Sequence, residues 1–475
     1  MANYIRKFKM DSEVILEAPK VQKKETPKVS RYWIFLSISA LLLAGFLSLF
    51  IMLGRTPVIN EWMFGPKLFR RILVVHVNLA LIVSFYSFLC GLFVLIPSSA
   101  SSNRFLPAGF FISIAGVLLM LTTIFIPAAT PILSNYIPVL NHSVFLVSLC
   151  LFGLGVALTL LNRRIIPFSF SGDDVNDSLL PPASVPALQS AAVLFLVSML
   201  LFFLSWMNTS VNLAAETYFE FLLWGGGHIL QFVNMAAAVA VWFVLLQQIS
   251  DRQLLSYKQS LLLFSVYTLP VLFSPLLLSG GTTDNLYITG FTHYMVWGIF
   301  PVISLVIILV IIRLIKLSKS GQLLSKPFTN PYYNGLVVSI TFIIGGFILG
   351  AMIRGSNTMV PAHYHATLGG ITIAFMVMTY KLLDYFGFSL TDGLWKKAAI
   401  QPLLYGTGQA IFVAGLAYAG TYGLARKVFG EEQIIHTSEI YIGLGLLVVG
   451  GLIAISGGVL FLWIVIKAWL NAKNG

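Results

Sequence analysis

The sequence predicts an all-α polytopic membrane protein, a bundle of about twelve transmembrane helices with both termini in the cytoplasm. Composition is the first observation behind this prediction. Of the 475 residues, 58% are hydrophobic and only 10% are charged, and the mean hydropathy is +0.89. Soluble domains carry about 25% charged residues, so this chain is expected to lie mostly in lipid. The lengths of its apolar runs and the placement of its basic residues are the second and third observations.

Twelve apolar runs are long enough for a transmembrane helix, which needs about 20 predominantly apolar residues. These runs cover residues 33–54, 72–97, 106–127, 138–161, 187–207, 217–248, 259–279, 290–315, 334–353, 359–383, 402–424 and 438–469. Residues 1–31 are polar, rich in Lys and Pro, and contain no apolar core of a signal peptide. They are predicted to form a disordered basic cytoplasmic tail. Residues 32–475 are predicted to form a single twelve-helix domain.

Basic residues set the predicted orientation. With the N-terminus inside, the cytoplasmic segments hold 22 of the 29 Lys and Arg residues, and the opposite side holds seven. Cytoplasmic loops carry the excess of Lys and Arg, so both termini are predicted inside, in a bacterial or archaeal cytoplasmic membrane. The net charge of +12 is then a consequence of membrane insertion, and no nucleic-acid partner is expected. No soluble segment is long enough to be catalytic, so any chemistry is expected within the membrane.

His363 and His365 are the most informative residues, because they lie two positions apart near the start of the tenth run. At about 100° per residue on a helix, positions two apart point to nearly opposite sides. One small metal ion cannot be held in this way, whereas two large haem groups can flank a single helix. A histidine in lipid is costly and usually functional. Haem ligation is therefore the leading interpretation of this pair.

Two further histidines are expected at a comparable depth. His76 lies near the start of the second run, and His228 follows Trp224 and three glycines in the sixth. Three glycines within a spanning helix lower its stability unless another group packs very close. Both have alternative interpretations: His76 as a core histidine bonded to a carbonyl, and the glycine run as a helix-packing surface. His293 is either a ligand or an interfacial residue, and His142 is predicted to be structural.

This arrangement resembles subunit I of the haem-copper oxidase superfamily, which includes cytochrome c and quinol oxidases and the related nitric oxide reductases. The resemblance extends over nearly all of the chain, with His in the second run, Gly-His in the sixth and His-x-His in the tenth. It implies that His76 and His365 are the axial ligands of a low-spin haem. It also implies that His363 is the proximal ligand of a second, high-spin haem, and that His228 helps to hold a copper or non-haem iron facing it.

The distal metal site departs from the family pattern. The family has a His-His pair just after the seventh span, but residues 274–284 contain no histidine. His293 is the single candidate substitute. Four residues after the histidine of the sixth span the family has Tyr or Glu, whereas this chain has Phe232, with Gln231 as a nearby polar alternative. One imidazole cannot hold a copper, so the distal metal site is expected to be incomplete.

The resemblance also implies cofactors and partners. Two haems, of b type, are the expected cofactors, and their propionates need cations on the outer side. Arg354, Arg426 and Lys427 are candidates for this role, although ordinary charges at the membrane edge explain them equally well. The two cysteines lie in apolar runs, with no Cys-x-x-Cys-His motif and no copper-thiolate cluster. Electrons must therefore come from other subunits of a membrane complex, such as a c-type cytochrome or a cupredoxin-like subunit, or from a quinol.

Three functional hypotheses stay open. The first, which leads, is a catalytic subunit of a respiratory oxidoreductase, in which His228, His293 and Gln231 surround a second haem that reduces dioxygen or nitric oxide. The second is a dihaem b-type electron-transfer subunit without distal copper, in which His228 moves onto the second iron opposite His363. The third is a haem-free transporter with a histidine proton relay, and the Gly-rich histidine site argues against it.

Overall fold

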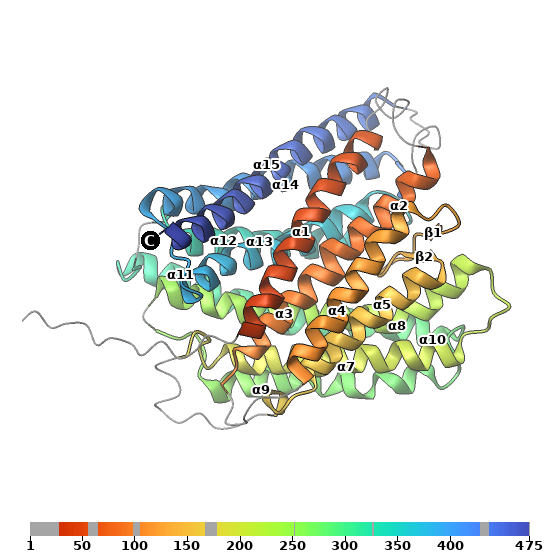
Figure 1. Ribbon diagram of the computed structural model, residues 1–475, viewed down its shortest axis with the longest axis horizontal. Coiled ribbons are helices and arrows are strands. Elements are labelled where there is room, and N and C mark those ends of the chain that lie inside the picture. Colours follow the sequence, from red (N-terminus) through yellow and green to blue (C-terminus); the bar gives the residue numbers. More distant parts are fainter. Residues whose placement is uncertain are drawn as a thin grey trace, which may run out of the picture.

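Twelve helices of membrane-spanning length and composition are found in the described part of the chain, which confirms the predicted fold class. The computed structural model describes residues 28–55, 65–97, 105–166, 178–250, 252–324, 327–427 and 437–474. The helices lie side by side and run between two ends of the molecule, with the C-terminus at one of them (Figure 1). Two short strands, β1 (Thr130–Ile132) and β2 (Val139–Asn141), lie at the other end, which we call the hairpin end.

The elements follow one another as a series of spans of alternating direction. The first three spans are α1 (Lys28–Arg55); α2 (Pro66–Val77) with the π-helix η2 (Asn78–Val83) and α3 (Ser84–Val94); and α4 (Phe105–Thr122) with η3 (Thr123–Phe125). The next four are α5 (Ser143–Leu160), α7 (Ser184–Asn208) after the short η4 (Arg163–Ile165), α8 (Ala215–Ile249), and α9 (Tyr257–Thr268) with η5 (Pro270–Leu278). The last five are α10 (Asn285–Tyr294) with the π-helix η6 (Met295–Ile299) and α11 (Phe300–Lys319); α12 (Pro331–Ala351); α13 (Met359–Tyr385); α14 (Asp392–Thr421); and α15 (Ser438–Asn474).

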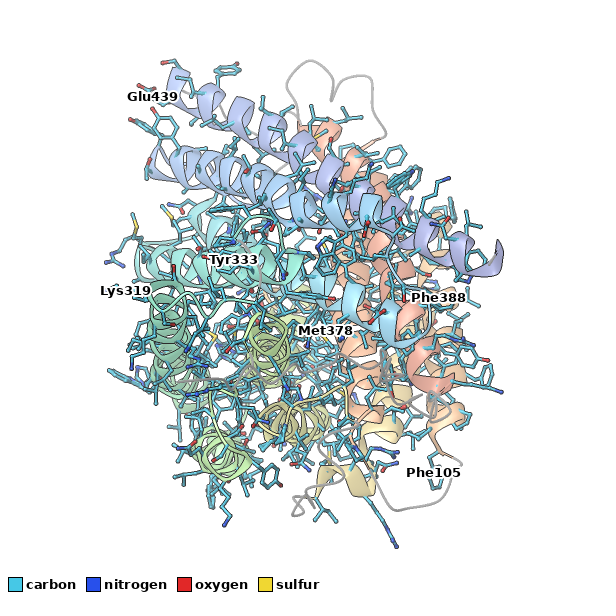
Figure 2. All side chains as sticks on the ribbon, turned by 90° about the vertical axis from the view of Figure 1, so that its left-hand side faces the viewer. Phe105, Lys319, Tyr333, Met378, Phe388 and Glu439 are labelled. Atoms are coloured by element: carbon cyan, nitrogen blue, oxygen red, sulfur yellow. The ribbon has the colours of Figure 1, made fainter. Side chains whose placement is uncertain are left out.

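Two helices that carry candidate ligands form the centre of the bundle. In the apolar stretch of α8 94% of the residues are buried, and in that of α13 83%, against 28% in the eighth span. Figure 2 shows α14 and α15 along one edge of the molecule and Met378 of α13 near its middle. The histidines of α8 and α13 therefore lie on helices enclosed by protein.

The β1–β2 hairpin replaces the start of the predicted fourth span. That span was expected from residue 138, but α5 begins at Ser143 because residues 139–141 pair antiparallel with 130–132. Pro138 has no N–H to offer a helix. His142 is the N-cap of α5, and its Nδ1 accepts from the backbone N–H of Val144 at 3.3 Å, so it has the structural role predicted for it. The connection between the strands lies against α8 and is part of the site described below.

Other boundaries also differ from the sequence prediction, and two of them reveal buried polar residues. The eleventh span begins at Asp392 rather than at 402, because its polar first turns and Gln401 belong to the helix. Gln401 is fully buried and accepts from the hydroxyl of Tyr380 at 3.1 Å, which an apolar run does not reveal. Helix α1 begins at Lys28, inside the predicted tail, where buried Ser30 donates to the Gly91 carbonyl at 2.7 Å. Residues 1–27 of that tail lie outside the described residues.

Candidate functional site

His363 projects from α13 toward α12. Its Nδ1 donates to the carbonyl oxygen of Gly346 at 2.7 Å. One turn further along α12, Gly350 leaves space for the ring, because a Cβ there would lie 2.8 Å from the same Nδ1. Gly350 therefore lets the imidazole pack against α12 while its Nδ1 is tethered to the Gly346 carbonyl.

His365 leaves the same helix on another side, toward α14. Its ring packs edge-on against Phe412, with the ring centroids 4.9 Å apart, and the side chain of Gln409 donates to its carbonyl oxygen at 3.1 Å. The two imidazoles of the His-x-His pair are thus directed at different neighbours, as the 200° separation on a helix requires. Each can serve a separate group.

His76 projects from α2 toward α1, where its Nδ1 donates to the carbonyl oxygen of Ala44 at 2.9 Å. The helix changes to a π-helix two residues later, at Asn78, and such segments are frequent at functional sites. Asn78 is fully buried and donates to the carbonyl oxygens of Val74 and Pro138 at 2.9 and 2.8 Å. The widened turn is therefore fastened both to its own helix and to the hairpin.

Aromatic contacts place His76 and His365 at matching heights. Phe375 stacks on Phe88, with the centroids 4.3 Å apart and an interplanar angle of 11°, and meets Phe85 edge-on at 5.3 Å. Phe85 and Phe88 lie nine and twelve residues beyond His76, and Phe375 lies ten residues beyond His365. Because the second and tenth spans run in the same direction, an equal rise along each helix brings the two histidines to one level.

The tethers of His76 and His363 select one imidazole tautomer. A carbonyl oxygen only accepts, so Nδ1 carries the proton and Nε2 keeps its lone pair. Within the part of the chain that the structure describes, Nε2 of either residue has no hydrogen-bond partner. Metal-ligating histidines almost always have their other nitrogen held in this way. The two side chains therefore fit haem iron as axial ligands.

His228 has the same tether but a different second partner. It is 1% exposed, and its Nδ1 donates to the carbonyl oxygen of Trp224 at 2.7 Å. Its Nε2 is therefore the acceptor in the contact with the Tyr136 hydroxyl at 2.9 Å. Desolvation raises the pKa of the Tyr136 phenol, and the carboxylate of Glu220 raises it further, so the hydroxyl keeps its proton. The ring is enclosed by Trp224, Tyr136 and Phe291.

Aromatic side chains fill the space left by the three glycines before His228. A Cβ on Gly225 would lie 2.9 Å from the ring of Phe291, and one on Gly227 would lie 2.6 Å from Cγ of Tyr136. A Cβ on Gly226 would overlap the ring of Phe202. The close packing expected from these glycines is therefore with protein side chains on all three sides.

Neither predicted companion of His228 is brought to it. Phe291 points toward His228, and His293, two residues later on α10, points to the other side of that helix and is exposed. Gln231 donates weakly to the Gly227 carbonyl of its own helix at 3.4 Å. Among the described residues, no group of three or more His, Cys, Asp or Glu side chains could hold a metal ion. In the described part of the chain, His228 therefore has neither of the two companions that the sequence hypothesis gave it at the distal metal site.

Comparisons with known proteins place this geometry in a family. The sequence model described as Cytochrome C and Quinol oxidase polypeptide I matches residues 28–453. The chain belongs to this family. The cryo-EM structure of a heme-copper terminal oxidase dimer has the same fold, with a TM-score of 0.68 and 16% identity over 93% of this chain and 84% of that chain. The family and fold implied by the His-x-His pattern are thus confirmed.

Two curated relatives match most of the chain. An uncharacterized protein of Aquifex aeolicus (strain VF5) is 30% identical over 369 residues, which cover 77% of this chain and 87% of the relative. Uncharacterized protein RP382 of Rickettsia prowazekii (strain Madrid E) is 28% identical over 516 residues, which cover 95% of this chain and 98% of the relative. The similarity to both therefore extends over most of the transmembrane bundle.

The three basic residues that were candidates for contact with haem propionates lie at the hairpin end and have different hydrogen-bond partners. Arg354, which follows α12, donates to the carbonyls of Ala351 and Ile353 at 2.9 and 3.0 Å, so it caps the end of that helix. Arg426 donates to Ser356 at 2.9 Å, and Lys427 to the side-chain oxygen of Asn135 at 3.4 Å. Burial and the neighbouring Arg426 lower the pKa of Lys427. Only Arg426 and Lys427 are positioned by other segments of the chain.

Two parts of the site were missed from the sequence. Tyr136 lies between the predicted third and fourth spans, and its contact with His228 depends on a turn that no motif marks. The carbonyls that tether His76 and His363 belong to α1 and α12, and backbone atoms have no sequence signature. The one available signal was the small residue at each position, Ala44 and Gly346, together with Gly350.

Proposed function

We propose that this chain is a haem-binding membrane subunit of a respiratory oxidoreductase complex that transfers electrons without a distal copper. One haem would be held between His76 and His365, and a second by His363. The observation that carries the proposal is the paired tether, in which Nδ1 of His76 and of His363 donates to a carbonyl and leaves Nε2 as the ligand atom. Bound haem iron supplies one-electron chemistry.

The protein's own contribution is orientation and exclusion of water. The carbonyls of Ala44 and Gly346 hold the two rings in one tautomer, which keeps them ready to bind metal without rearrangement. Phe412 packs on His365. Further along the two helices from the histidines, Phe375 of the tenth span stacks on Phe88 of the second. A dry, aromatic surrounding of this kind supports electron transfer, because little solvent has to reorganise when charge moves.

The donor set around His228 supports the absence of copper. A copper site needs several nitrogen or sulfur ligands, whereas His228 stands alone, with both nitrogens in hydrogen bonds and three aromatic rings around it. His293 faces away. This favours a haem-binding subunit without copper over the copper-assisted catalysis of the family at large.

Reduction of dioxygen or nitric oxide at the second haem is a second candidate function. The contact between Tyr136 and His228 favours it, because Nε2 of His228 is already occupied and is not free to bind iron. The position opposite His363 would then be open to a small ligand. Catalysis by this route would use a haem alone.

The test is metal and haem analysis of the purified protein. We expect two b-type haems per chain, no stoichiometric copper, and loss of one and the same haem in His76→Ala and His365→Ala. His363→Ala should remove the other haem. His142→Ala is the matched control, since His142 caps α5, and it should keep both haems. Retention of both haems in all three ligand variants, or one copper per chain, would overturn the proposal, and a carbon monoxide shift on one haem would support the second candidate.

Orientation and electron supply belong to the same proposal. The excess of basic residues supports both termini in the cytoplasm, with the hairpin end and its candidate ligands toward the outer side. A C-terminal reporter that is active only in the cytoplasm should therefore be active. The electron donor would be a partner subunit of the c-type cytochrome or cupredoxin kind, or a quinol, because the described cysteines, Cys90 and Cys150, are single free thiols.

A further inference from the structure

Tyr136 occupies the one nitrogen of His228 that could bind iron. The tether to Trp224 fixes the proton of His228 on Nδ1, so Nε2 has a single lone pair, and that lone pair accepts from the phenol at 2.9 Å. The two rings lie 4.4 Å apart at 47°. While this hydrogen bond is made, His228 has no nitrogen lone pair free to bind a metal.

The phenol is held there by the connection between β1 and β2. The backbone N–H of Asn135 donates to the carboxylate of Glu220 at 3.1 Å, and its side-chain amide donates to the other carboxylate oxygen. Pro138 is held by Asn78, two residues beyond His76. Tyr136 therefore sits between two anchors, one on α8 and one on the π-helix of the second span.

Helix α8 leaves space for the ring of Tyr136 at Gly227. Gly227 has no Cβ, and a Cβ there would lie 2.6 Å from Cγ of Tyr136. Helix α8 packs against both α12 and α13, the helices that carry the tether of His363 and His363 itself. The pair therefore lies on a helix that packs against both helices of the second proposed haem position.

We infer that Tyr136 sets the ligation state of the second haem by keeping His228 off the iron that His363 would hold. This inference rests on the proposed function. With the phenol in place, the second haem would stay free to bind a small neutral diatomic ligand. Without it, Nε2 of His228 would be free and would compete with that ligand for the iron. Tyr136 acts through His228 and is therefore a positioning residue.

The test compares Tyr136→Phe with the wild-type holoprotein by optical and EPR spectroscopy, with and without carbon monoxide. The Phe ring keeps the packing against Gly227 and removes only the hydroxyl. In the wild type we expect one high-spin haem that binds carbon monoxide. In Tyr136→Phe we expect the high-spin signal to become low-spin and carbon monoxide affinity to fall by about tenfold or more, as an internal ligand competes for the iron.

A double variant identifies the competing ligand. Tyr136→Phe combined with His228→Leu should restore the high-spin signal and the carbon monoxide response, because the competing imidazole is gone. The unchanged low-spin haem of His76 and His365 reports correct folding in every variant. Two low-spin haems in the wild type, or an unchanged second haem in Tyr136→Phe, would overturn this inference while leaving the dihaem proposal in place. A protein that binds fewer than two haems overturns both.

Discussion

The hydroxyl of Tyr287 bridges the backbone of α8 at Gly225, one turn before His228. It accepts from the Gly225 N–H at 2.9 Å and donates to the carbonyl of Phe221 at 2.8 Å, the two partners of one α-helical hydrogen bond. Side chains that insert into this ladder bend helices. The helix α10, which follows the seventh span, is thereby fastened to the turn of α8 that precedes His228.

Replacing Tyr287 should weaken this junction. In Tyr287→Phe the bridged backbone groups lose their partner in a buried position, and such a loss costs about 1–3 kcal/mol. We expect a lower midpoint of thermal unfolding, which is measured by haem absorbance in detergent. Tyr294→Phe is the control on the same helix, since its hydroxyl bonds to Pro270 at the exposed surface at 3.2 Å. An equal fall in both variants would argue against a special role of the bridge.

Gly350→Ala should remove the haem proposed for His363 and spare the other. The new Cβ would lie 2.8 Å from Nδ1 of His363, so the ring must turn and lose its tether to Gly346. Loss of such an outer partner weakens metal binding by about 10–100-fold. Haem content of the purified variant measures the effect. Gly345→Ala, on the same helix with open space around it, should behave like the wild type.

Gly227→Ala should act on the Tyr136–His228 pair from the opposite side. The added methyl group meets the Tyr136 ring and pushes the hairpin connection outward, at a cost of about 1–3 kcal/mol for overpacking. We expect the spectral change of Tyr136→Phe together with a lower thermal midpoint. Gly445→Ala in α15, where a Cβ meets nothing within 4 Å, is the control. A normal spectrum in Gly227→Ala would mean that the hairpin adapts without releasing the phenol.

The stability of the hairpin end should increase at alkaline pH because of Lys427. Burial and Arg426 hold the pKa of Lys427 below its ordinary value of 10.5. The unfolded chain therefore binds more protons than the folded protein between the lowered pKa and 10.5, and stability rises with pH in that window. Thermal midpoints of the wild type should gain on those of Lys427→Met as pH rises through it. Parallel curves for the two proteins would contradict this expectation.

The predicted spans illustrate what can be read from one sequence. Runs of about 20 apolar residues identify helices in lipid, because every backbone group there must form its hydrogen bond within its own segment. All twelve membrane-spanning helices were therefore predicted. The starts of the first and eleventh spans were misplaced for one reason. Gln401 is polar and Ser30 is next to charged residues, yet both are buried against other helices. Burial against a neighbour is not a local property of the chain.

In the candidate site, too, some features follow from the local sequence and others depend on contacts between segments. The sequence alone determined that His363 and His365 face different directions, because two residues on one helix have a fixed angular relation. It also pointed to the missing histidines after the seventh span. Only the tertiary structure decided what fills the space beside His228, because Tyr136, Phe202 and Phe291 come from three separate segments. Contacts between segments distant in sequence depend on the packed bundle, and no spacing along the chain encodes them.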